Sequence, residues 1–250
     1  MSRHSRRLRF ARARRDREPG VRQFDGAVQP GLPYRRGAEE AVADAAPRAG
    51  DSGVSGLTGD VPGRVLIVCT GNICRSPYIE RALRQRFASL GSDVVVESAG
   101  TGALVGHPIA EPMARLMESA GIDAADGAGR RLTRDMVTDA DLILTAEREH
   151  RSAVVSLLPG ALRRTFSVRQ FARLLGQLEP GAEQLTLPDL VAVAAASRGA
   201  TPSQGADDDV PDPWQRPDAE YQRVIDLLEA PLEVIATRVG ATRARPTDDA

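Results

Sequence analysis

From residue 64 onward, short apolar runs alternate with longer segments in which apolar residues recur at helical spacing. The runs predict four strands, at Val65–Val68, Val94–Val96, Leu142–Leu144 and about Arg164–Val168. The segments between and after them predict helices, at Ser76 to about Leu90, near Met113–Ala120, around Arg148–Leu158 and after Val168. Strands separated by helices predict an α/β fold with a central four-stranded parallel sheet and helices on both faces.

The first and last helices carry distinct boundary and packing signals. In the first, Ser76 is the predicted N-cap, Pro77 takes the first helical position and Gly91 follows the end. Pro231 falls inside the last helix, which starts at about Asp218, and it is expected to kink or interrupt that helix. The residues of the last helix expected to face the core are Tyr221, Val224, Ile225, Leu228, Leu232 and Ile235.

The two ends of the chain lack this periodicity. Residues 1–62 are rich in Arg, Gly, Pro and Ala and predict a disordered extension, and residues 241–250 predict a disordered tail. The folded domain is expected at residues 63–240. Residues 1–60 hold 12 arginines against 8 acidic residues, so this segment is a weak candidate for binding nucleic acid or an anionic surface. A solvated extension, or sequence upstream of the true start, is the simpler interpretation.

Composition narrows the classes of function. The 250 residues carry a net charge of −1, which indicates neither a nucleic acid nor a membrane as partner. Lysine is absent, which excludes a Walker-type phosphate loop, since that loop depends on its lysine. Two cysteines exclude a disulfide framework and a Cys-rich zinc site, and His4, His107 and His150 are too scattered for a metal cluster, so neither metal nor cofactor is expected. His107 and His150 are interpreted as loop or surface residues. No run of about 18 apolar residues and no secretory pattern occurs, so a cytoplasmic location is expected.

Residues 69–76, which follow the first strand, read Cys-Thr-Gly-Asn-Ile-Cys-Arg-Ser. The backbone N–H groups of such a turn and the positive end of the next helix attract an oxyanion. Arg75 adds a planar fork suited to two phosphate oxygens, and the same positive field favours the thiolate form of Cys69. Gly71 and Asn72 tolerate the left-handed backbone that a tight anion loop requires. Because anion sites in parallel sheets lie at carboxyl ends of strands, beside a switch in strand order, the segment predicts a cysteine-dependent phosphatase.

The segment Val68–Pro77 resembles the signature of the low-molecular-weight protein tyrosine phosphatase family at nearly every position. Asp212–Trp214 (Asp-Pro-Trp) is similar to the segment in which that family carries its general acid. Glu97–Thr101 and Asp141–Leu144 resemble further landmarks of the family, in the same order. The resemblance extends over about residues 63–239.

Residues 176–208 are longer than the family usually needs here, and they predict a loop insertion. Within it, Leu187–Ala196 is expected to form a short helix and Ser197–Asp209 a flexible loop. The acidic end, Asp207–Asp209, is interpreted as a solvated face. It could instead repel acidic substrates or raise the pKa of Asp212 through like charge.

The resemblance implies a protein tyrosine phosphatase that acts on phosphotyrosine proteins through a phosphocysteine intermediate, without a cofactor. Cys69 would attack phosphorus, while Arg75 and the amides of residues 70–75 would stabilise the oxygens. Asp212 would protonate the leaving oxygen and then act as base for water. The family uses the Asn72 side chain to brace the loop and the Ser76 hydroxyl to stabilise the thiolate, although Ser76 could serve as a helix cap alone. The expected substrate-binding residues are Thr70, Gly71, Asn72, Ile73, Cys74, Ser76 and Trp214.

Two further features bear on substrate and redox chemistry. Trp214 is similar to the aromatic wall that the family places beside a phenol ring, which favours phosphotyrosine over the shorter phosphoserine. Ile73 and Tyr78 are expected to shape the pocket mouth, and Ala146–Glu147 stand where the family commonly has Met-Asp. Cys74 is either a small buried filler or, as the resemblance implies, a partner for a reversible disulfide that protects the nucleophile.

Three alternatives stay open at this point. One alternative is a protein-arginine phosphatase of the same family, although that branch tends to have Thr where this chain has Ile73. An arsenate reductase of the same fold could use a small-molecule thiol, whereas the thioredoxin-coupled version needs cysteines after Cys74, and there are none. A non-catalytic phosphotyrosine-binding protein, or one that binds nucleic acid through its tail, belongs to a different class. The sequence makes no prediction of an oligomeric state.

Overall fold

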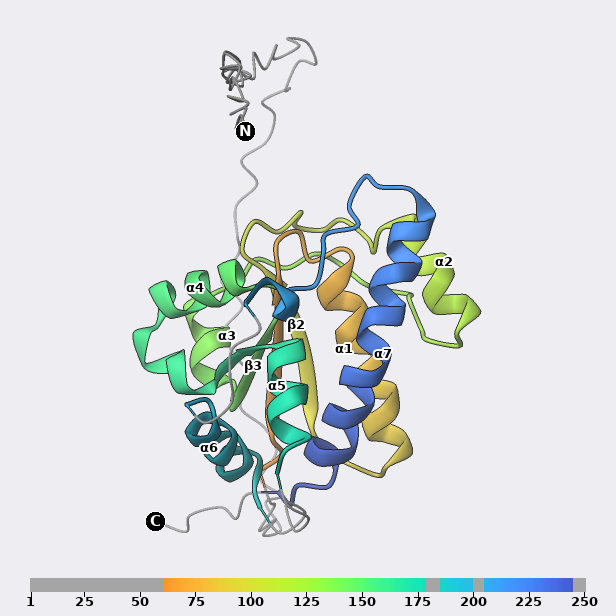
Figure 1. The fold of residues 1–250 in the computed structure, drawn as a ribbon. Helices are drawn as coiled ribbons and strands as arrows, with labels where there is room; N and C mark the ends of the chain where they lie inside the picture. Colours follow the sequence, from red (N-terminus) through yellow and green to blue (C-terminus); the bar gives the residue numbers. More distant parts are fainter. Residues whose placement is uncertain (1–60, 179–184, 200–204, 245–250) are drawn as a thin grey trace, which may run out of the picture. The chain divides into compact units, whose positions relative to one another are not determined.

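The computed structural model describes residues 61–178, 185–199 and 205–244, and the predictions for residues 1–60 and 245–250 lie outside this part. Its sheet has four parallel strands in the order β2-β1-β3-β4 (Figure 1). The strands are β1 Arg64–Cys69, β2 Val95–Gly100, β3 Leu142–Thr145 and β4 Thr165–Ser167. The predicted α/β fold with a four-stranded parallel sheet is confirmed.

Helices alternate with these strands and lie against both faces of the sheet (Figure 1). The α-helices are α1 Arg75–Ser89, α2 Glu111–Ser119, α3 Arg134–Asp139, α4 Arg148–Leu157, α5 Val168–Leu175, α6 Leu187–Ser197 and α7 Asp218–Gly240. Two short 3-10 helices are η1 Pro159–Arg164 and η3 Gly205–Asp208. Among them, α6 confirms the helix expected within the insertion.

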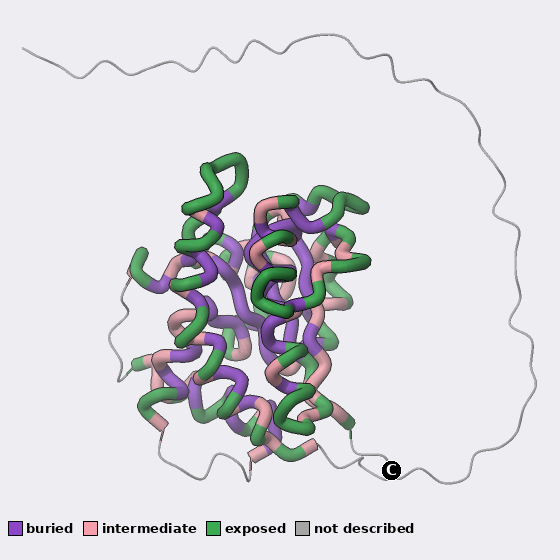
Figure 2. Tube along the Cα trace, turned by 90° about the vertical axis from the view of Figure 1, so that its right-hand side faces the viewer, coloured by how far each residue is buried: buried purple, intermediate pink, exposed green. Residues whose placement is uncertain are grey.

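The alternation of side chains along β1 separates two hydrophobic clusters. Val65 and Ile67 point into the larger cluster, which contains residues of α1, α5 and α7. Leu66 and Val68 point into the smaller one, with residues of α3, α4 and η1. A strand that is buried on both faces must be apolar at every position, which explains the continuous run in the sequence. Figure 2 shows the buried residues, in purple, toward the middle of the folded part of the chain.

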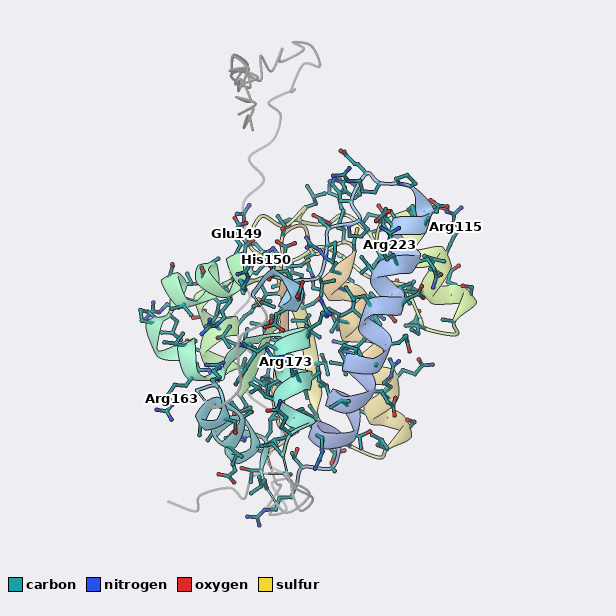
Figure 3. All side chains as sticks on the ribbon, viewed as in Figure 1. Arg115, Glu149, His150, Arg163, Arg173 and Arg223 are labelled. Carbon is teal, nitrogen blue, oxygen red and sulfur yellow. The ribbon has the colours of Figure 1, made fainter. Side chains whose placement is uncertain are left out.

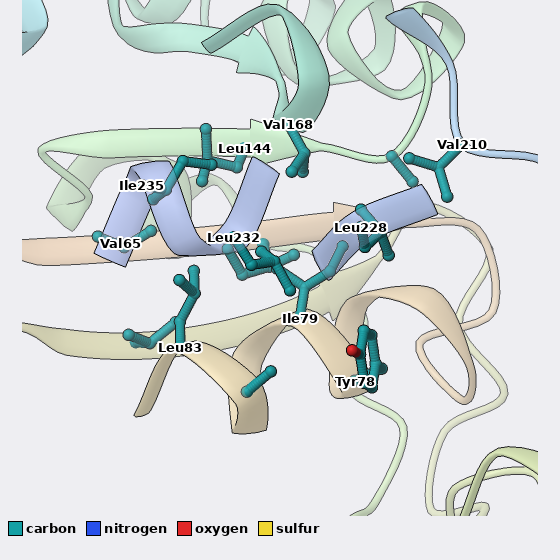
Figure 4. Close-up of a cluster of buried hydrophobic side chains, with 14 of the residues drawn as sticks. Val65, Tyr78, Ile79, Leu83, Leu144, Val168, Val210, Leu228, Leu232 and Ile235 are labelled. Carbon is teal, nitrogen blue, oxygen red and sulfur yellow. The ribbon is translucent and has the colours of Figure 1, made fainter. Parts of the chain in front are cut away.

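Helix α7 packs against α1 and the sheet in the larger cluster (Figure 4). All six residues expected to face the core are buried: Tyr221, Val224, Ile225, Leu228, Leu232 and Ile235. Pro231 lies inside α7, which continues through it, so the expected interruption does not occur. After α7, the N–H of Arg243, which lies in the segment expected to form a disordered tail, donates to the carbonyl of Leu185 at 3.0 Å.

Several predicted boundaries were wrong. Strand β2 runs to Gly100 because its polar half, Glu97–Gly100, keeps pairing with β1. Helix α3 was missed; its six residues are too few for a helical period, and Thr133 caps it by accepting a bond from the N–H of Met136. The predicted flexible loop Ser197–Asp209 contains η3, although residues 200–204 lie outside the described part.

Candidate active site

Cys69 is the last residue of β1, a central strand of the sheet. Strand β1 pairs with β2 on one side and with β3 on the other, so the chain reverses its direction of progress across the sheet at β1. This is the switch in strand order beside which parallel sheets bind ligands. The predicted placement of the cysteine is therefore confirmed.

Two donors surround the sulfur of Cys69. The Ser76 hydroxyl lies 2.9 Å from Sγ, and the backbone N–H of Asn72 donates to Sγ at 3.3 Å. Both side chains of the Cys69–Ser76 pair are buried. The prediction that Ser76 caps α1 was wrong: the N-cap position is Cys74, and no side chain caps the helix there. The hydroxyl contacts the sulfur of Cys69 instead.

Asn72, the only asparagine in the chain, braces the loop. Its backbone is left-handed, with φ of 55°, as the sequence predicted. Its side-chain N–H₂ donates to the hydroxyls of Ser76 and Ser98, both at 2.8 Å, and its Oδ1 accepts from the N–H of Arg130 at 2.8 Å. Ser98 in turn donates to the buried carboxylate of Glu80. The brace therefore ties the loop to β2 and α1 through satisfied buried groups.

The segment after β2 fastens the other side of the loop. Backbone N–H groups of Thr101, Gly102 and Leu104 donate to the carbonyls of residues 69, 70 and 71 at 2.9–3.0 Å. A Cβ at Gly100 would lie 2.3 Å from the carbonyl oxygen of Thr70, so only glycine fits. The landmark Glu97–Thr101 in the sequence thus has a direct structural reason.

Arg75 is almost fully buried and holds several partners with one guanidinium. Its Nη1 pairs with Glu147 and donates to the carbonyl of Val210 at 3.0 Å. Its Nη2 lies 2.9 Å from Oδ2 of Asp212. Its Nε is buried and has no hydrogen-bond partner. A buried donor without an acceptor is costly, so this atom is suited to an acceptor from a ligand.

Residues 207–212, here called the acid segment, bring Asp212 to Arg75 from more than a hundred positions away in the sequence. The Asp212 side chain is 45% exposed, and its Oδ1 accepts from the N–H of Trp214 at 3.2 Å. Trp214 is itself exposed at 42%. The predicted arginine and acid are thus paired, with the tryptophan two residues beyond the acid, and the predicted nucleophile Cys69 stands at the start of the loop that leads to Arg75.

Sequence reasoning missed His150, which is not a surface residue as expected: only 3% of it is exposed. Its Nδ1 accepts from the N–H of Glu147 at 3.1 Å, which leaves Nε2 protonated and donating to the Thr70 hydroxyl at 2.8 Å. Burial, together with the positive charge of Arg75, lowers the pKa of His150. His107, by contrast, is exposed as predicted.

Glu147 was also missed as a partner of Arg75, although its unusual identity at this position was noted. A signal for both residues existed. They follow β3 directly, and the carboxyl ends of β1 and β3 meet at the same edge of the sheet.

Cys74 and its neighbours face the core. Cys74 is a buried free thiol that interacts with Tyr221, and burial raises its pKa to about 12. Ile73 is buried, and its carbonyl accepts from the N–H of Ala110 at 2.7 Å. The expectation that Tyr78 shapes a pocket mouth was wrong: its ring is in the core (Figure 4), and its hydroxyl donates to Glu229 at 2.6 Å.

Within the described residues, no three His, Cys, Asp or Glu side chains gather in a way that could hold a metal ion. None of the helices described is both long and apolar enough to cross a membrane.

Comparison with known proteins decides the family. Residues 64–189 match the family model described as low molecular weight phosphotyrosine protein phosphatase. The chain belongs to this family. Etp, a low molecular weight protein-tyrosine-phosphatase of Escherichia coli K12, is 41% identical over 125 residues, which are 50% of this chain and 75% of Etp. Wzb of Salmonella typhi, with the same description, is 28% identical over 184 residues, 73% of this chain and 98% of Wzb.

Solved structures agree with this assignment. The tyrosine phosphatase Wzb from Escherichia coli K30, in complex with sulphate, has a TM-score of 0.52 at 26% identity, covering 72% of this chain and 99% of Wzb. The YwlE arginine phosphatase from Geobacillus stearothermophilus has a TM-score of 0.54 at 26% identity, covering 71% of this chain and 93% of YwlE. The predicted hydrolase class is confirmed. The family model ends at residue 189, so the contribution of Asp212 rests on its geometry.

Proposed function

We propose that this member of the low molecular weight phosphatase family hydrolyses phosphotyrosine in proteins through a phosphocysteine intermediate. The observation that carries the proposal is the loop from Cys69 to Arg75: the sulfur of Cys69 is met by the N–H of Asn72, and the buried guanidinium of Arg75 pairs with Asp212 while its Nε has no partner. A phosphate oxygen would supply the acceptor that Nε lacks.

In the first step, the Cys69 thiolate attacks phosphorus, a P–S bond forms and the P–O bond to the leaving group breaks. The guanidinium of Arg75 and the loop amides take up the charge on the remaining oxygens. Asp212, in its protonated form, gives its proton to the departing oxygen, because a phenolate is a poor leaving group. A phosphate at Arg75 competes with Asp212 for the guanidinium, which frees the carboxyl to act on the leaving oxygen.

In the second step, water attacks phosphorus and the P–S bond breaks. The Asp212 carboxylate accepts the proton of the water, so phosphate leaves and the thiolate is restored. Ser76 and the N–H of Asn72 stabilise the sulfur as charge returns to it. This sequence needs no metal ion or cofactor among its reactants.

The preference for phosphotyrosine rests on Trp214, which is exposed, and on Ile73, which is buried in the loop. Trp214 presents an exposed ring two residues from the acid, and a phenol ring can pack against it. Ile73 contributes an apolar side chain to the loop, where the arginine-phosphate branch tends to have Thr. These two residues support tyrosine over arginine as the phosphate carrier.

The test compares four substrates with the purified full chain: a phosphotyrosine peptide, the matched phosphoarginine peptide, a phosphoserine peptide, and arsenate with glutathione. We expect hydrolysis of the phosphotyrosine peptide to dominate. Cys69→Ser should abolish it, and Asp212→Asn should reduce it by about 10²-fold or more, whereas Asp218→Asn, at an exposed carboxylate on α7, should not. Faster turnover of phosphoarginine, or thiol-dependent reduction of arsenate without ester hydrolysis, would favour the corresponding alternative.

A further inference from the structure

We propose that Arg148, Arg169 and Arg173 are positioning residues that hold the acid segment so that Asp212 stands beside Arg75. The proposal rests on the proposed function for the role of Asp212. The three arginines lie within the residues that match the family model, whereas the acid segment that they contact lies beyond them.

Helix α5 holds the start of the acid segment. Arg173 Nη2 lies 2.9 Å from Oδ2 of Asp208, whose side chain is only 4% exposed. Arg169, one turn earlier on α5, donates to the carbonyl of Asp207. A buried carboxylate without its cation is strongly unfavourable, so Asp208 is fixed where Arg173 stands. Arg173 lies over α5 in Figure 3.

Helix α4 holds the middle of the acid segment. Oδ1 of Asp209 accepts from the backbone N–H of Arg148 at 2.9 Å, and Oδ2 lies 3.1 Å from both Nε and Nη2 of the same residue. Arg148 is the first residue of α4, where backbone N–H groups lack partners within the helix and carry partial positive charge. Asp209 therefore serves both the side chain and the helix end.

The contacts of Arg148, Arg169 and Arg173 with residues 207–209 are here called the clamp. Val210 connects the clamp to the site. Its N–H donates to the carbonyl of Ala146 at 2.8 Å, and its carbonyl accepts from Arg75 at 3.0 Å. Its side chain is buried in the larger cluster, as Figure 4 shows. Pro211, with its fixed φ, is the one residue between this anchor and Asp212. Each residue from 207 to 210 is thus held by α1, α4, α5 or the end of β3.

This anchoring matters because Asp212 cannot hold itself in place during the reaction. Its carboxylate pairs with Arg75, the group that a substrate phosphate would occupy. Once phosphate binds, the position of Asp212 depends on the backbone behind it. Preorganised placement of a proton donor is a large part of its effect on rate, so the clamp would keep the acid within reach.

The first test does not depend on activity. Trp214 is the only tryptophan and lies two residues after Asp212, so its fluorescence reports on this region. Arg148→Gln and Asp209→Asn should each raise acrylamide quenching of Trp214 by about 1.5-fold or more, because the segment becomes more mobile. Arg64→Gln, which removes the 3.1 Å pair with Glu97 at the opposite end of β1, is the matched control and should leave quenching unchanged.

The second test measures kcat/KM, which reports formation of phosphocysteine, on p-nitrophenyl phosphate and phenyl phosphate. The clamp variants should lose about fivefold more on phenyl phosphate, whose poor leaving group needs the acid. The double variant Arg148→Gln/Asp209→Asn should have a kcat/KM no lower than that of the more impaired single variant, because both substitutions remove the same ion pair. Arg173→Gln extends the series but leaves Asp208 buried and unpaired, so the conclusion is drawn from the Arg148 and Asp209 variants.

A uniform loss on both substrates with lower thermal stability would show a purely structural role and overturn the proposal. Unchanged quenching and unchanged kcat/KM would overturn it as well. If the wild-type chain hydrolyses neither ester, the proposed function fails, while the fluorescence comparison still decides whether the arginines hold the segment.

Discussion

The loop that carries Cys69 and the segment that carries Asp212 both reach Arg75, yet they are held by different forces. The cysteine loop is fixed by hydrogen bonds among buried neutral groups, with Asn72 at the centre. The acid segment is fixed by arginine side chains of α4 and α5: the pair of Arg148 with Asp209 is partly exposed, whereas Asp208, which pairs with Arg173, is buried. Neutral buried networks depend on shape and are insensitive to salt, whereas exposed ion pairs are weak one by one and act as a group.

The cysteine loop has contacts between residues close together in the sequence, besides the bonds of Asn72 to Ser98 and Arg130 across 26 and 58 positions, whereas the acid segment is held by contacts between distant residues. Asn72 bonds Ser76 across four positions, and Cys69 meets Ser76 across seven. Arg148 meets Asp209 across 61 positions, and Arg75 meets Val210 across 135. The first kind of contact makes a recognisable string of residues; the second does not.

The largest effect is expected from a change at Arg75, the residue that both regions contact. Arg75→Lys should reduce kcat/KM for a phosphotyrosine peptide by about 10²–10³-fold, because lysine cannot present the planar fork or replace the pairs with Glu147 and Asp212. Arg223→Lys, on the exposed face of α7, is the control. Steady-state kinetics on both variants measure it, and a loss under about tenfold would contradict the central place of the guanidinium.

Breaking the cysteine loop alone should come next. Asn72→Ala removes three hydrogen bonds: the N–H of Arg130 loses its acceptor, and the hydroxyls of Ser76 and Ser98 lose a donor. We therefore expect about 2–4 kcal/mol less stability and about 10²-fold lower kcat. The control is Gln222→Ala, which removes an exposed amide that donates to Asp226. Urea unfolding and kinetics on the pair test this, and an Asn72→Ala protein with normal stability would show that the network is dispensable.

His150 distinguishes the two regions by pH. Its pKa is lowered in the fold, so the unfolded chain binds a proton more readily below about pH 6.5 and the fold loses stability as pH falls from there. Above that range the stability that depends on the neutral ring is fully present. His150→Gln should therefore lose less thermal stability than the wild type between pH 7.5 and 5.5, while lowering kcat about tenfold through Thr70. Melting temperatures measured across this pH range check the prediction, and an equal fall in melting temperature for the two proteins would contradict it.

The smallest effect is expected at Trp214, the exposed residue that follows the acid segment. Trp214→Ala should raise KM for a phosphotyrosine peptide by about three- to tenfold and change kcat little, because ring packing stabilises ground state and transition state alike. Inorganic phosphate, which has no ring, should inhibit both proteins equally. An equal KM for the peptide would remove Trp214 from substrate binding.

The parts that were predictable from the sequence are those with local physical causes. Strand β1 is recognisable as an apolar run, and the loop as a thiol, a left-handed Asn72 and an arginine in fixed spacing. The surroundings of Arg75 were not predictable in the same way. His150 and Glu147 sit in an ordinary helix start, and Asp208 reads as one acid in a charged run. Their contacts depend on partners that only folding brings near.

Gly100 shows that the position of the cysteine loop depends on a residue of β2, outside residues 69–76. The carbonyl of Thr70 occupies the volume that a methyl group at position 100 would need. The loop can lie flush against the second strand only because that strand has a notch there. A substitution at Gly100 that is chosen to raise the strand propensity of β2 would push the carbonyl of Thr70 away, and it would lift the thiol of Cys69 away from its donors.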